Sequence, residues 1–118
     1  MSDRDADREM LEAVRKIFED GIPFNKVLGL TIESLDRESG SIRLTMRDEL
    51  IGNPYRGSLH GGAVSTTLDV IGGLVAFLAV VKSMKGKPDE EKLERFSRMG
   101  TLDLRVDYLR PGLGKHFL

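Results

Sequence analysis

Apolar side chains recur every three or four residues over the first part of the chain. Between residues 3 and 19 they share one side of a helical period, and arginine, aspartate and glutamate occupy the other side. Asp20-Gly21, followed by Pro23, supplies the usual signals for the end of a helix. The pattern therefore predicts an amphipathic helix over residues 3–19 that packs on the edge of the domain.

The pattern then changes to a period of two. Apolar residues hold every second position from 28 to 32 and again from 42 to 46, with a polar turn that ends in Gly40 between the two runs. Such a pair predicts an antiparallel hairpin with one buried face. A further alternating run covers residues 102–108 and stops at Pro111-Gly112, so we expect a third strand there.

The most apolar stretch extends from about Gly62 to Ser83 and is long enough to span a membrane. Asp69 lies inside it, and an acidic residue near the centre of a span costs about 2.5–3.5 kcal/mol on insertion scales. A helix that is apolar on nearly all sides is also typical of the centre of a globular domain. Because a lone span would leave the flanking strands unexplained, we interpret this stretch as a buried helix and expect no membrane association.

A polar connection follows this helix, from Lys82 to Arg98. Two interpretations fit it: a solvated connection, which we favour, and a short helix over Asp89 to Phe96 that Pro88 would open. The predicted order is helix, two strands, long helix, connection and strand. We expect a single domain over residues 1–118, with its core from residue 24 onward.

Composition excludes several classes of function. The chain has 118 residues and a formal net charge of −1, so it carries no overall basic field for a nucleic acid. It has no cysteine and only two distant histidines, which argues against a metal centre or a Cys nucleophile. The charged N-terminus lacks the apolar run of a secretory signal. We therefore expect a cytoplasmic protein without a metal or cofactor.

The candidate chemistry lies where the apolar helix begins. His60-Gly61-Gly62 would place unpaired backbone N–H groups at the positive end of the helix dipole, and glycine lets a ligand approach them closely. Such donors suit a carbonyl oxygen that becomes an oxyanion during acyl transfer. Asp69 is the only acidic residue between Leu50 and Pro88, and it must be either satisfied structurally or available as a base.

Helix geometry adds a constraint on this pair. Gly61 and Asp69 are eight positions apart, or about 12 Å along one helix. One carbonyl cannot lie within about 3 Å of both groups in the same chain. A two-fold axis would bring Gly61 of one copy beside Asp69 of the other, so a catalytic pair here predicts a homodimer. Gly72-Gly73 costs about 1 kcal/mol per residue inside a helix, which favours close packing against another helix or an acyl chain.

A family resemblance rests on these residues. The run Asn53…Gly57-x-Leu59-His60-Gly61-Gly62, the Asp nine residues after His60, and the later Asp107-Tyr108-Leu109-Arg110-Pro111 resemble the hotdog-fold acyl-CoA thioesterases of the phenylacetate-pathway type. The resemblance covers roughly residues 20 to 115. It implies an α+β fold in which a curved antiparallel sheet wraps a long helix. It also implies edge-to-edge homodimers, which often pair again into homotetramers, and hydrolysis of an acyl-CoA thioester.

The resemblance also implies roles for individual residues. Asp69 would be the general base or nucleophile, and the Gly61 N–H would polarise the thioester carbonyl. His60 and Asn53 would orient the site or the attacking water, and Thr101 matches a hydroxyl that family members often place early in the strand after the helix. Each has a simpler interpretation: His60 satisfies loop groups, Asn53 stabilises its turn, and Thr101 is a strand residue.

The implied substrate contacts lie beside these residues. Gly62 extends the amide-rich helix start, and Arg56 and Arg110 are positioned to meet the phosphates of coenzyme A. The second half of the helix, Leu74 to Val81, would line an apolar acyl pocket. The acyl group itself is not defined by the sequence.

Two departures from the family pattern carry expectations. The Lys82–Arg98 connection is longer than is common, which would alter the rim of the acyl pocket. The family's domain normally continues for about two strands after the Arg-Pro turn, in the middle of the sheet, whereas this chain stops at Leu118. Without them the 102–108 strand would have no neighbour in the chain, so we expect reduced stability or altered assembly.

Two other functions fit the same fold. An enoyl-thioester hydratase pairs an Asp with a His about five residues later, and here that position is Leu74, which argues against it. A non-catalytic acyl-CoA-binding or regulatory module is the stronger alternative. Release of free thiol from acyl-CoA separates the enzyme from the module.

Overall fold

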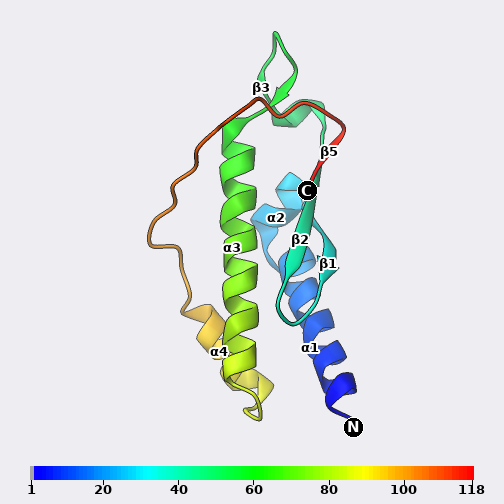
Figure 1. Ribbon diagram of the computed structural model, residues 1–118, viewed down its shortest axis with the longest axis vertical. Helices are drawn as coiled ribbons and strands as arrows, with labels where there is room; N and C mark the ends of the chain where they lie inside the picture. Colours follow the sequence, from blue (N-terminus) through cyan, green and yellow to red (C-terminus); the bar gives the residue numbers. More distant parts are fainter. Residues whose placement is uncertain (1) are drawn as a thin grey trace.

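The long helix is the axis of the structure, and a hairpin and the N-terminal helices lie against one side of it (Figure 1). The computed structural model describes residues 2–118. The elements are α1 (Asp3–Lys16), η1 (Ile17–Gly21), α2 (Pro23–Leu28), β1 (Thr31–Leu35), β2 (Gly40–Thr45), η2 (Asp48–Leu50), β3 (Ile51–Asn53), β4 (Ser58–Leu59), α3 (Gly61–Ser83), α4 (Asp89–Ser97) and β5 (His116–Phe117).

The predicted N-terminal helix is confirmed, with a different end. Ser2 caps α1 by accepting the Asp5 N–H at 3.2 Å, and the helix continues into the wider turn η1 as far as Gly21. The short helix α2 was not predicted. It begins at Pro23, whose missing N–H is no loss in a first turn, and it ends at Gly29 with φ of 74°. Leu28 is therefore the last residue of a helix, and its prediction as a strand position was wrong.

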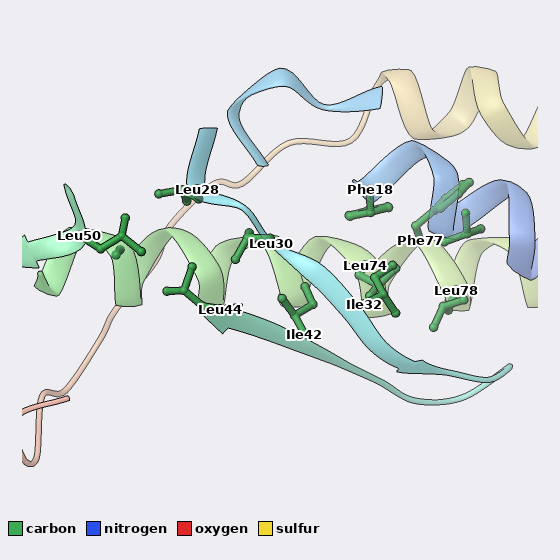
Figure 2. Close-up of a cluster of buried hydrophobic side chains, with 12 residues drawn as sticks. Phe18, Leu28, Leu30, Ile32, Ile42, Leu44, Leu50, Leu74, Phe77 and Leu78 are labelled. Atoms are coloured by element: carbon green, nitrogen blue, oxygen red, sulfur yellow. The ribbon is translucent and has the colours of Figure 1, made fainter. Parts of the chain in front are cut away.

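The predicted hairpin and its burial against the long helix are confirmed. In β1 and β2, Ile32 lies opposite Ile42. Figure 2 shows the apolar side chains of both strands facing α3, and these residues are buried together with Leu74, Phe77 and Leu78. By length and composition α3 could cross a membrane. Its contacts with the hairpin instead make it the core helix of the fold.

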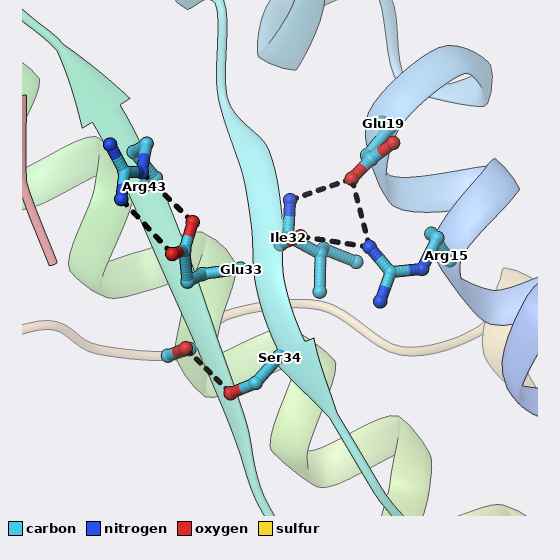
Figure 3. Close-up of polar contacts among 7 residues, drawn as sticks. Arg15, Glu19, Ile32, Glu33, Ser34 and Arg43 are labelled. Carbon is cyan, nitrogen blue, oxygen red and sulfur yellow. Dashed lines mark hydrogen bonds and ion pairs between the residues drawn. The ribbon is translucent and has the colours of Figure 1, made fainter.

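Side chains from the N-terminal helices close the outer edge of the sheet (Figure 3). The Ile32 N–H donates to the Glu19 carboxylate at 2.7 Å, and the Ile32 carbonyl accepts from Arg15 at 2.8 Å. On the same hairpin, Arg43 and Glu33 form a two-point ion pair at 2.8 and 3.0 Å. The main-chain groups of Ile32 are thus satisfied at the edge that β1 would otherwise expose.

The prediction of a third strand over residues 102–108 was wrong. These residues run beside α3 (Figure 1), but within residues 2–118 their main-chain groups pair with no other strand, and Leu102 is fully exposed. A strand exists through hydrogen bonds to a neighbour, so alternation alone does not produce one. The chain joins the sheet only further on, where Phe117 of β5 lies opposite Leu44 of β2.

The connection after α3 forms the short helix α4, the less favoured of the two interpretations, and Phe96 of this helix packs against the core. The Phe96 ring lies 4.6 Å from that of Phe77 in α3 and 5.8 Å from that of Phe18 in η1, both in tilted geometry. The connection after α3 is therefore solvated on one side and packs against α3 through Phe96 on the other.

Candidate active site

A tight loop carries the chain from the sheet to the start of α3. The Asn53 side chain accepts the Tyr55 N–H at 3.0 Å, and its carbonyl accepts the Gly57 N–H at 2.8 Å. The His60 N–H donates to the Leu50 carbonyl at 2.8 Å. A Cβ at Gly52 would lie 2.6 Å from the His60 Cα, so only glycine permits this approach. The sequence analysis missed Gly52. Asn53 stabilises the turn that leads to His60.

His60 leaves one amide free at the helix start. Its Nδ1 accepts the Gly62 N–H at 2.7 Å, which makes His60 the N-cap of α3. The Gly62 amide is therefore occupied. The Gly61 N–H has no partner among residues 2–118. It is a free donor at the positive end of the helix dipole, which is the feature that a developing oxyanion requires.

Tyr108 packs directly on this glycine. Its hydroxyl donates to the Gly61 carbonyl at 2.8 Å, and its ring lies 3.3–3.5 Å from the place of a Gly61 Cβ. Tyr108 was not predicted as a site residue, although it belongs to the family motif around Arg110. The alternation of the 102–108 run indicated only a core position for it.

The predicted acid and hydroxyl do lie together. The Thr101 hydroxyl donates to the Asp69 carboxylate at 2.5 Å, from the extended segment to the middle of α3. Asp69 is half-buried and Thr101 is exposed. The second carboxylate oxygen of Asp69 accepts no hydrogen bond within the described chain. It is not buried, so water can reach it and donate one.

The structure forms two separate groups from the predicted residues. His60 and Gly61 lie at the start of α3, and Asp69 and Thr101 lie further along it. Because α3 is one continuous helix from Gly61 to Ser83, the two groups stay about 12 Å apart in one chain. The single chain thus presents both halves of the predicted chemistry without joining them.

A groove of about 640 Å³ opens beside Asp69 and Thr101. Its lining is mostly apolar and comes from η1, α3, α4 and the extended segment, and includes Phe18, Ile22, Leu68, Phe96, Met99 and Leu104. Of the stretch Leu74–Val81 that was expected to line an acyl pocket, Ala76 lines this groove, whereas Leu74, Phe77 and Leu78 are buried under the hairpin. The side of α3 that faces the groove carries Gly72 and Gly73 beside Ala76.

The two predicted phosphate contacts lie at the surface. Arg56 is at the exposed tip of the β3–β4 loop, and Arg110 is exposed before the final turn. Neither forms an ion pair within residues 2–118. Among the residues that the structure describes, no three His, Cys, Asp or Glu side chains lie close enough together to hold a metal ion.

Sequence comparison finds long matches to enzymes of one kind. The chain is 38% identical over 109 residues to the medium/long-chain acyl-CoA thioesterase YigI of Escherichia coli K12, covering 92% of this chain and 70% of the relative. The YigI protein of Salmonella typhimurium matches at the same identity and coverage. No family model matches the chain.

Structural comparison agrees. A crystal structure from Shewanella oneidensis, described as related to the thioesterase superfamily, superposes with a TM-score of 0.88 at 42% identity. The match covers 94% of this chain and 72% of that one. The Shewanella structure therefore shares the fold of this chain, with its long helix and antiparallel sheet, over nearly all of the described residues.

Proposed function

Because this chain belongs to the hotdog-fold thioesterases, we propose that it hydrolyses an acyl-CoA thioester through Asp69 and the Gly61 amide. Asp69 takes a proton from water, whose oxygen then attacks the thioester carbonyl, or Asp69 attacks the carbonyl itself and forms a mixed anhydride that water afterwards hydrolyses. On either route the carbonyl oxygen accepts a hydrogen bond from the Gly61 N–H. The C–S bond breaks, the thiolate of coenzyme A leaves and takes up a proton, and the acid is released. Thr101 orients the Asp69 carboxylate through its hydrogen bond.

The observation that carries the proposal is the Gly61 amide, which has no partner within residues 2–118 and lies at the start of the helix that also bears Asp69. Removing one such donor from an oxyanion site typically costs about 100- to 1,000-fold in turnover. The separation of about 12 Å along α3 requires two copies of the chain, with Gly61 of one beside Asp69 of the other. The proposal therefore includes a homodimer, which can pair again into a homotetramer.

The proposed substrate is an acyl-CoA with a medium or long chain. The Escherichia coli relative is named for that class, and the groove beside Asp69 is mostly apolar. Arg56 and Arg110 would meet the phosphates of coenzyme A. We also propose that the protein is cytoplasmic. The absence of cysteine is compatible with a reducing compartment.

The amide is tested by two variants that differ in a single N–H group. Gly61→Pro removes the N–H at the first helical position, where proline is tolerated, and His60 before it already has the extended backbone that proline favours. Gly61→Ala adds a similar Cβ against Tyr108 and keeps the N–H. We expect Gly61→Pro to lose about 100-fold or more in kcat relative to Gly61→Ala. Equal rates for the two folded variants would contradict this role.

The acid is tested with Asp69→Asn, which keeps the shape of the side chain and its bond to Thr101. We expect turnover of acyl-CoA, followed as free thiol, to fall by orders of magnitude while the unfolding midpoint stays close to that of the unaltered chain. Asp20→Asn, at an exposed position of η1, is the matched control and should hydrolyse normally. Near-normal hydrolysis by Asp69→Asn would end the proposal.

A further inference from the structure

Phe96 is held in place from two sides. The tilted contacts with Phe77 of α3 and Phe18 of η1, at 4.6 and 5.8 Å, are arrangements in which aromatic rings attract one another beyond simple burial. Phe96 is half-buried, and it lines the groove that opens beside Asp69. One face of a fixed ring is thus available to the groove.

The groove has a direction along α3. Asp69 and Thr101 lie near one end of it, whereas Phe96 lies beside Phe77, eight residues further along the helix. Eight residues correspond to about 12 Å. Met99 lies on the same side as Phe96, at the point where the chain leaves α4.

Between these ends α3 lines the groove with Val70, Ala76 and two glycines. Gly72 and Gly73 line the groove, and a Cβ built on either would meet nothing within 4 Å. These glycines therefore do not serve packing within the described chain. They leave open the space between Asp69 and Phe96.

We infer that Phe96 forms the end wall of the acyl site and limits the length of the chain that the enzyme accepts. This inference rests on the proposed function, since it takes the acyl carbonyl to lie at Asp69. An extended chain advances about 1.2 Å per bond, as it does along an extended polypeptide. A distance of about 12 Å therefore holds an acyl chain of about ten carbons. The favoured substrates are saturated acyl groups from octanoyl to decanoyl, with longer chains meeting the Phe96 ring.

The wall is tested by shortening it. The rate constant kcat/KM is measured with butanoyl-, octanoyl-, dodecanoyl- and tetradecanoyl-CoA for the unaltered chain and for Phe96→Ala. We expect the ratio of dodecanoyl to octanoyl hydrolysis to rise about tenfold, because a few methylenes in an apolar pocket are worth that much discrimination. An unchanged ratio in a folded variant would overturn the inference.

A second variant covers the case in which Phe96→Ala does not fold, because it also removes core contacts. Gly73→Leu places a side chain in the groove, where a Cβ meets nothing within 4 Å, and improves helix propensity. We expect octanoyl hydrolysis to fall about tenfold or more while butanoyl hydrolysis is kept and the unfolding midpoint is not lowered. Ala79→Leu, on an exposed part of α3 that does not line the groove, is the matched control and should keep the original profile.

The outcomes separate this inference from the function beneath it. If the unaltered chain hydrolyses no acyl-CoA, the proposed function fails. If it does so and Gly73→Leu lowers all chain lengths equally, only the end wall fails. An equal loss accompanied by a change in oligomeric mass, measured by light scattering, would assign Gly73 to a contact between copies and would also overturn the inference.

Discussion

Individual hydrogen bonds determine what the start of α3 can do. His60 accepts the Gly62 N–H, Tyr108 donates to the Gly61 carbonyl, and the Gly61 N–H has no partner in the described part of the chain. These contacts hold the first turn of the helix from two sides, so that its one open donor keeps a constant direction. Sequence reasoning identified His60 and Gly61 from the local motif. It missed the contact with Tyr108, because 47 positions separate the two partners.

Tyr108→Phe tests this positioning role with the loss of one oxygen. A typical hydrogen bond contributes about 1 kcal/mol, so we expect kcat to fall about fivefold with KM nearly unchanged, since the acyl groove is not touched. Tyr55→Phe, at a tyrosine whose ring is almost entirely exposed on the β3–β4 loop, is the control. A rise in KM at constant kcat would show that Tyr108 binds substrate rather than positions Gly61.

At the scale of elements, the hairpin depends on charged groups at its surface. The guanidinium of Arg43 holds the pKa of Glu33 below its ordinary value of 4.5, mainly through their hydrogen bonds. In the turn, the N–H of Glu38 and the hydroxyl and N–H of Ser39 lower the pKa of Asp36 below its ordinary value of 3.8. A carboxylate whose pKa is lowered by folding stabilises the fold above its unfolded pKa. It loses that contribution as pH falls through the folded one.

The hairpin should therefore weaken in acid. We expect the unfolding midpoint to decline as pH falls below about 4, in the range that lies between the ordinary and the lowered pKa values of these carboxyls. Asp36→Asn should lower the midpoint at neutral pH and flatten the decline. Thermal unfolding by circular dichroism between pH 7 and pH 2 measures both effects, and a parallel decline in variant and parent would contradict the assignment.

At the scale of the whole molecule, the distance between the Gly61 amide and the Asp69 carboxylate along α3 requires a second copy of the chain to complete the proposed site. One outer edge of the sheet is occupied at Ile32 by Arg15 and Glu19 (Figure 3), whereas no strand of residues 2–118 pairs with the extended segment at 102–108. The proposed second copy would accordingly approach on the side of α3 and this segment. Its Gly61 would then reach the Asp69 of the first copy.

Mixing two inactive variants tests this arrangement directly. When Asp69→Asn and Gly61→Pro chains are co-expressed and pair at random, half of the dimers combine both, and each of these holds one intact site between copies. We expect about a quarter of the unaltered activity to return. No return of activity in mixed dimers, shown by tagged co-purification, would place the site within one chain and contradict the proposed interface.

Local patterns in the sequence were sufficient for the elements whose stability depends on near neighbours. The periods of 3.6 and 2 identified α1, α3 and the hairpin, and Pro88 indicated α4 as the less favoured of two interpretations. The spacing of Gly61 and Asp69 fixed their distance, because the rise of a helix is constant. The family resemblance named Asp69 and Thr101 separately, and the structure brings the two side chains within hydrogen-bond distance.

Tertiary structure alone decided the features that need distant partners. The 102–108 run has the alternation of a strand, but it pairs with no strand among the described residues. A strand needs donors and acceptors on a neighbour, and alternation within one segment does not supply them. Leu74, Phe77 and Leu78 face the core and not the groove, since the hairpin covers that side of α3. Phe96 meets Phe18 and Phe77 only through the path of the chain after α3. Periodicity describes one segment at a time, whereas burial and pairing depend on what the rest of the chain places beside it.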